Sequence, residues 1–215
     1  MPRLRKAARL WRDPEARADA ARVIVPGDGP LFTVDPAAIF TRAAPLEIEI
    51  GAGRGDFAID YAAAHPDRNL LAIELAASVA RVMAVRAARR GAANLRVLIM
   101  DARPLVRLML PERSVARFHI YFPDPWPRES QQKHRLFSPG FAAGLYRTAA
   151  ENGAVSVATD FEPYASEIFA TLEGAGFRQV EAPVPGARLT GFARKFIAAG
   201  RQIFAGEFVP DRDHG

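Results

Sequence analysis

The residues best suited to chemistry in this sequence are acids at the ends of apolar runs. They are Glu49, Glu74, Asp101, Asp124 and Asp160. If these runs are strands of one parallel sheet, their acids meet at one edge, because parallel strands end together. Carboxylates gathered there repel one another unless a cation or hydrogen-bond donors lie among them. A ligand with a sulfonium or ammonium charge, a ribose diol and an adenine satisfies that requirement.

A glycine-rich turn follows the first of these runs. The apolar run 46–50 leads into Gly51, Gly53 and Gly55, and an apolar segment of helical character follows at 57–64. Glycines let the backbone turn sharply and approach a ligand closely, and the next helix begins with free N–H groups. The spacing is not the G-x-G-x-x-G of dinucleotide enzymes. It resembles motif I of S-adenosylmethionine-dependent methyltransferases, with an ordinary strand–helix turn as the alternative.

Two further acids have roles that their positions suggest. Glu74 ends the run after the glycine turn, where a carboxylate can accept hydrogen bonds from both ribose hydroxyls. Asp101 follows the next run, where it can accept a hydrogen bond from an adenine amino group.

A separate stretch, 121–128, places prolines around Asp124 and Trp126, and we expect a rigid loop because prolines fix the backbone. A proline-capped strand end with a core tryptophan is the alternative.

Strands and helices alternate along most of the chain, which indicates an α/β domain with a parallel sheet. Expected strands are 46–50, 70–74, 95–100, 117–122 and 154–158. Expected helices are 56–64, 77–90, 103–110, 139–150 and 161–175. The runs 177–181 and 202–208 predict an antiparallel pair at the sheet edge. Because Pro183, Pro185, Gly186 and Gly191 break regular structure, we expect 183–200 to be a loop that becomes ordered on binding.

Composition limits the class of protein. The 215 residues suit one globular domain, since half are apolar and charge is ordinary. The chain has no cysteine, which excludes disulfides, thiolate zinc sites and cysteine nucleophiles. The sequence contains no readable signal peptide or membrane-length apolar run, so we expect a cytoplasmic protein. No acid–histidine cluster has metal-ligand spacing, and we expect no metal.

The positive charge is concentrated near the N-terminus. Residues 1–22 hold seven Arg or Lys against three acids, which accounts for +4 of the net charge of +5. The breaker-rich segment 26–30 then predicts a turn or linker. We therefore expect a basic N-terminal arm and linker at 1–30, and a single domain at 31–215. The arm can contact a polyanion, form a solvated helix, or pair two chains, which leaves monomer and homodimer open.

Together, several motifs resemble the bacterial tRNA (guanine-N7)-methyltransferases, the TrmB family. The resemblance covers roughly residues 46–208. It is carried by Glu49-Ile-Gly-Ala-Gly-Arg-Gly, Ala72-Ile-Glu74, Phe122-Pro-Asp-Pro-Trp-Pro, Ala158-Thr-Asp160 and Thr190-x-Phe192. It implies a class I S-adenosylmethionine-dependent methyltransferase, with a Rossmann-like, seven-stranded and mostly parallel sheet covered by helices on both faces. The implied activity is methylation of a variable-loop guanine of tRNA.

The resemblance also implies site residues. S-adenosylmethionine would be bound by Glu49, Gly51, Gly53, Glu74, Asp101 and Asp124. Asp124 would also be the catalytic residue, and the tRNA substrate would be bound by Arg128, Asp160, Thr190 and Phe192. Guanine N7 carries a lone pair and no proton, so no general base is needed, and we expect Asp124 to stabilise the guanine as it becomes cationic. Asp160 would accept from the N1–H and N2–H groups, and Trp126 or Phe122 would stack on the base.

Two departures from the family pattern fall on the tRNA side. The basic run after the proline loop is interrupted by Glu129, Ser130 and Gln131, and Ala193 stands where the family has an acid. The basic arm can supply phosphate contacts in their place. Two alternatives therefore stay open: a methyltransferase with another acceptor, and an RNA-binding relative without activity.

Overall fold

The computed structural model describes residues 11–25, 34–184, 186 and 190–212, and its chain divides into two compact units, 1–102 and 103–215. The basic arm is described only from residue 11 onward, and the predicted linker at 26–30 lies outside the described residues. Within the described part of the chain, no helix is both long and apolar enough to cross a membrane.

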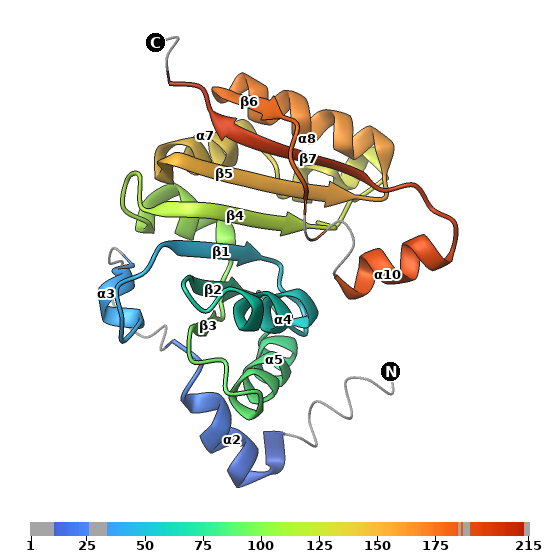
Figure 1. Cartoon of the computed structure of the whole chain (residues 1–215). Helices are drawn as coiled ribbons and strands as arrows, with labels where there is room; N and C mark the ends of the chain where they lie inside the picture. The colour runs from blue at the N-terminus through green and yellow to red at the C-terminus, as the bar shows by residue number, and fades with distance from the viewer. Residues whose placement is uncertain (1–10, 26–33, 185, 187–189, 213–215) are drawn as a thin grey trace. The chain divides into compact units, whose positions relative to one another are not determined.

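The first unit is built on three parallel strands in the order β3-β2-β1 (Figure 1). Their bounds are Leu46–Ile50 for β1, Asn69–Ile73 for β2 and Leu95–Leu98 for β3. Every residue of β1 and β2 is buried, as expected for strands covered on both faces. Its helices are α2 (Pro14–Ala21), α3 (Pro36–Ile39), α4 (Asp56–Ala64) and α5 (Ala77–Arg89).

The described part of the arm packs on the first unit. Helix α2 lies against α5, where Arg89 pairs with Asp19 at 3.2 Å. The Arg81 guanidinium lies 4.6 Å from the centre of the Trp11 ring. Ile24 also forms an isolated parallel bridge with Val97 of β3. Residues 11–25 are therefore docked on the body.

The second unit is a four-stranded sheet in the order β4-β5-β7-β6. Strands β4 (Val115–Tyr121) and β5 (Ala149–Thr159) run parallel, while β7 (Phe204–Pro210) is antiparallel to both β5 and β6 (Phe177–Val180). The predicted antiparallel pair near the C-terminus is thereby confirmed. The unit also holds α7 (Pro139–Thr148), α8 (Glu162–Gly174), α10 (Gly191–Ala198), the π-helix η1 (Leu105–Met109) and the 3₁₀-helix η2 (Glu129–His134). The short helix α6 spans Ala102–Pro104.

One predicted loop contains a helix, and one predicted helix is two residues shorter than expected. Residues 191–198 form α10 rather than a loop, because Thr190 caps the helix with a hydrogen bond from the Ala193 N–H to its hydroxyl at 2.9 Å. The helix expected at 139–150 ends at Thr148, since Ala149 is extended and begins β5.

An ion pair joins three strands of the second unit. Arg117 of β4 pairs with Glu207 of β7, and Ser156 of β5 donates to the same carboxylate. Glu207 is buried, and its hydrogen bonds to these two partners offset the free-energy cost of removing its charge from water. The network holds β4, β5 and β7 in register.

Candidate functional site

The glycine turn of the first unit closes on the neighbouring strand. Gly51, Gly53 and Gly55 have φ of +76°, +58° and +73°, a region that other residues enter only with strain. The Gly51 N–H donates to the Ile73 carbonyl at 2.9 Å. A Cβ added to Gly51 would meet no atom within 4 Å, so the space beside it is open to a ligand. At Gly55 the equivalent Cβ would lie 2.6 Å from Met83 Cγ, so this glycine serves packing.

Glu74 holds the turn in place. Its carboxylate accepts from the Gly53 N–H at 2.9 Å and from the Ala76 N–H at 2.8 Å. A carboxylate has about four acceptor positions, so Glu74 can still accept from two hydroxyls. The structure thus brings together Gly53 and Glu74, two of the residues that the sequence predicted.

Glu49 is buried, and one of its carboxyl oxygens has no hydrogen-bond partner in the described structure. Its side chain is 4% exposed, and its Oε2 has no hydrogen-bond partner among the described residues. Burial, with smaller contributions from the charges of Asp56 and Glu74, raises the pKa of Glu49 to about 8. A buried acceptor in this state favours a cation or a strong donor at that oxygen.

Asp101 completes the acids of the first unit. Strands β1, β2 and β3 end in register, with Ile50 opposite Ile73 and Ile73 opposite Leu98. Asp101 follows the end of β3 by three residues and is half-buried. The carboxyl edge of this unit therefore carries Glu49, Glu74 and Asp101.

The proline loop of the second unit follows β4 and contains no helix, as predicted. Phe122 continues the ladder by donating from its N–H to the Ala158 carbonyl at 2.7 Å. Both Phe122 (φ +53°) and Trp126 (φ +39°) then adopt left-handed backbone conformations, which cost free energy for residues with a side chain. Between them Asp124 is exposed, and no hydrogen bond or ion pair holds it in the described structure.

Asp160 lies where β5 ends, and the sequence did not predict its partner. Arg201, which follows α10, forms an ion pair with it, and the same guanidinium lies 5.1 Å from the centre of the Phe196 ring. Arg201 therefore links α10 to the carboxyl end of β5. No local motif marks such a pair, because its members are 41 residues apart.

Aromatic side chains of α10 pack against the end of β4, beyond which this helix lies in Figure 1. The Phe122 ring centre is 5.5 Å from that of Phe196 and 6.4 Å from that of Phe192. Phe192 nevertheless remains 58% exposed, which leaves ring surface for a further aromatic group. Thr190, also predicted to bind substrate, is buried and caps the helix.

The basic segment after the proline loop is only partly exposed to solvent. Arg128 and Lys133 are exposed, as expected of phosphate contacts. Trp126 packs beside His134, with ring centres 5.4 Å apart. Arg135, by contrast, is 8% exposed and turned into the protein. Arg135 therefore does not belong to the exposed part of this run.

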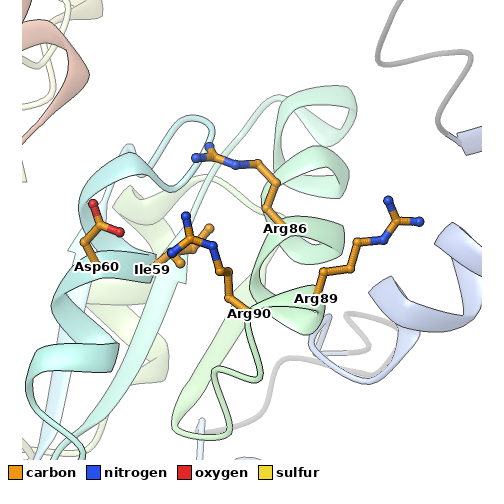
Figure 2. Close-up of a pocket in the computed structure, with 5 residues that line it drawn as sticks. All are labelled: Ile59, Asp60, Arg86, Arg89 and Arg90. Atoms are coloured by element: carbon orange, nitrogen blue, oxygen red, sulfur yellow. The ribbon is translucent and has the colours of Figure 1, made fainter.

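A cavity of about 220 Å³ lies elsewhere, between α4 and α5 of the first unit. Figure 2 shows Arg86 and Arg90 reaching toward Asp60 on α4, while Arg89 points away. Arg86 is paired with Asp56 at 2.8 Å and Arg89 with Asp19. Nearby acids thus balance most of this positive charge, and the cavity contains none of the predicted site residues.

His65 and His119 both make contacts within the fold. His65 caps α4 and stacks on Tyr61 with ring centres 4.0 Å apart, and it is half-buried. His119 is buried in β4 within hydrogen-bond distance of the Tyr121 hydroxyl. Among described residues, no group of three His, Cys, Asp or Glu side chains has a geometry that could hold a metal ion.

Comparison with known proteins places these residues in context. A family model described as "Putative methyltransferase" matches residues 43–205. The chain is 33% identical over 174 residues to a tRNA (guanine-N(7)-)-methyltransferase of Sodalis glossinidius, covering 81% of this chain and 73% of that protein. It is 35% identical over 209 residues to the protein of the same name from Leifsonia xyli subsp. xyli, covering 90% of this chain and 92% of that protein.

A solved structure shows the same fold at much lower identity. The 16S rRNA methyltransferase KamB superposes with a TM-score of 0.60 at 16% identity, covering 88% of this chain and 99% of that chain. The fold class expected from the sequence, a class I methyltransferase with seven mostly parallel strands, is confirmed.

Proposed function

The chain belongs to the tRNA (guanine-N(7)-)-methyltransferase family, and from that membership we propose that it methylates N7 of a guanine in the variable loop of tRNA. The family match carries this proposal, because it spans residues 43–205 and thus both the glycine turn and the proline loop. The acids at the carboxyl edge of the first unit support it, and so do the exposed Asp124 and the strand-end Asp160 of the second unit. The same span supports treating 31–215 as one methyltransferase domain with 1–30 as its arm. The cytoplasm, where tRNA is found, is the proposed location.

The residues of the first unit fit S-adenosylmethionine. The unpartnered Glu49 oxygen suits a cationic group, the remaining acceptor positions of Glu74 suit the ribose diol, and Asp101 suits the adenine amino group. The open space beside Gly51 allows the ligand to approach the backbone, with Gly53 held by Glu74. When bound, this cofactor supplies an electrophilic methyl group on a sulfonium.

Asp124 is the residue that we propose to be catalytic. The carboxylate is exposed on a loop whose backbone is fixed by three prolines, so it can meet a substrate without reorganising. Guanine gains positive charge as N7 is methylated, and a fixed carboxylate stabilises that charge. No proton has to leave N7, so Asp124 acts by charge and orientation rather than as a base. A contact from Asp124 to the cofactor is part of the same proposal.

Asp160 is proposed to select guanine. A carboxylate can accept from the N1–H and N2–H groups of guanine, a donor pair that adenine lacks. Arg201 already donates to this carboxylate, and it neutralises part of the charge that guanine would otherwise meet. Asp160 must then serve two partners, which its acceptor capacity allows.

Exposed aromatic and basic groups of the second unit suit RNA. The free surface of Phe192, supported by Phe122, offers a base a ring on which to stack. Arg128 and Lys133 offer exposed charges to phosphates. Thr190 contributes by capping the helix that carries Phe192, and its hydroxyl hydrogen remains available to a ligand acceptor.

The direct experiment incubates the protein with an unmodified tRNA transcript and a methyl-labelled donor, followed by nucleoside analysis. We expect the label in 7-methylguanosine, and none in a matched transcript whose variable-loop guanine is replaced by adenosine. Label in another nucleoside would instead support a methyltransferase with a different acceptor, which the departures at Ala193 and 129–131 leave open. Donor binding without any methyl transfer would support an inactive RNA-binding relative.

A further inference from the structure

The proline loop creates a problem of backbone hydrogen bonding. Pro123, Pro125 and Pro127 have no N–H group, so the loop has few donors of its own for its carbonyls. Carbonyls that are sheltered from water still need a donor. A donor from outside the loop can supply the missing hydrogen bonds, and the sequence does not indicate which residue that is.

Arg135 supplies that donor from the far end of η2. Its Nε donates to the Pro125 carbonyl at 2.9 Å, and its Nη2 lies 3.5 Å from the Trp126 carbonyl. Its Nη1 pairs with Glu167 of α8, and its guanidinium lies 4.8 Å from the centre of the Tyr164 ring. One planar group thus connects two successive loop carbonyls to α8.

These contacts act where the loop is under strain. Trp126 has a φ of +39°, which a non-glycine residue keeps only when its surroundings hold it there. Arg135 donates to the carbonyl of Pro125, the residue before Trp126, and to the carbonyl of Trp126 itself. Asp124 lies immediately before Pro125, so the anchor is one residue from the proposed catalytic carboxylate.

We propose that Arg135 is a positioning residue, which fixes the Asp124 loop on α8 and makes no contact with tRNA phosphate. The inference rests on the proposed role of Asp124. Its burial removes it from the RNA-facing surface, in contrast to the exposed Lys133 two residues earlier. The forked guanidinium is required, because a lysine ammonium cannot serve two carbonyls and a carboxylate in one plane.

Steady-state kinetics separate positioning from phosphate binding. For Arg135→Gln we expect kcat for tRNA methylation to fall about 10- to 100-fold, the scale of a small misplacement of a reacting group, with KM for tRNA changed less than about 3-fold. Arg135→Lys should restore little of this activity. The matched variant Lys133→Gln should instead raise KM and reduce the salt slope of tRNA binding by about 1.

A second measurement reports the loop directly. The chain has two tryptophans, so in a Trp11→Phe background the fluorescence comes from Trp126 alone. We expect acrylamide quenching of Trp126 to rise at least about 2-fold in Arg135→Gln, because the loop loses its anchor. If Arg135→Gln fails to fold, Arg135→Lys provides the same two readouts.

Opposite results would overturn the proposal. A raised KM with kcat retained and rescue by lysine would make Arg135 a phosphate contact. Unchanged kcat or unchanged quenching would show that the loop does not depend on it. Failure of the proposed function is recognised separately, because the wild-type protein would then produce no 7-methylguanosine while the quenching comparison still reports on the loop.

Discussion

Glu49 should make the stability of the unliganded protein fall as pH rises. Burial raises the pKa of this carboxyl to about 8 in the folded protein, whereas in the unfolded chain its ordinary value is 4.5. Between these values the folded state holds a proton that the unfolded state has released. The contribution of this proton to the free energy of unfolding is therefore complete below pH 4.5 and is lost as pH approaches 8. From pH 5 to pH 8 the loss amounts to at most about 3.5 kcal/mol.

The matched variant is Glu49→Gln, which stays neutral at every pH and nearly preserves the shape of the protonated acid. Chemical denaturation of both proteins at pH 5, 6, 7 and 8 gives the free energy of unfolding of each. We expect the wild-type value to fall relative to the variant as pH rises, with most of the difference between pH 5 and pH 7.5.

Binding of a cationic donor should reverse the effect. A positive charge near Glu49 favours the carboxylate, so binding at pH 7 should release a proton that calorimetry detects in buffers of different ionisation enthalpy. Glu49→Gln should release none from this position. If wild type and variant lose stability in parallel across the whole range, Glu49 titrates as an ordinary carboxyl and the reasoning is refuted.

Three further substitutions test the framework of the site. Glu207→Ala removes the buried partner of Arg117 and should cost about 3 kcal/mol in urea unfolding; a cost below about 1 kcal/mol would show that the network contributes little. Gly55→Ala places a Cβ 2.6 Å from Met83 Cγ at a positive φ, so thermal unfolding should show a loss of about 1–3 kcal/mol, and a neutral result would mean that the turn adapts. Thr190→Ala removes the α10 cap and should cost about 1 kcal/mol, with faster amide exchange in α10; unchanged exchange would contradict the capping role.

Local patterns predicted the elements that form the glycine turn. Strand β1 and helix α4 have the predicted bounds of 46–50 and 56–64, because a continuous apolar run, clustered glycines and a helical apolar face coincide there. The neighbouring strands β2 and β3 were placed to within two residues. Their common carboxyl edge followed from the general rule that parallel strands end together.

Interactions between distant residues were not predictable in the same way. Arg135 belongs to a basic run, which is ordinarily a solvated surface, and only the fold shows that it is buried against Tyr164 and Glu167. Arg201 lies far along the chain from Asp160, and no spacing rule connects them. Helix α10 was missed because the preceding prolines and glycines suggested a loop, while the cap at Thr190 begins a helix immediately after them.

The most direct test of the account is the single-turnover rate of tRNA methylation by Asp124→Asn, measured with donor and tRNA both saturating. Under these conditions affinity no longer contributes, and the rate reports the chemical step. Because a fixed charge that stabilises the transition state is typically worth about 100-fold or more, we predict a fall of at least that size. A rate within a few-fold of wild type would contradict the proposal that Asp124 stabilises the charge developing on guanine.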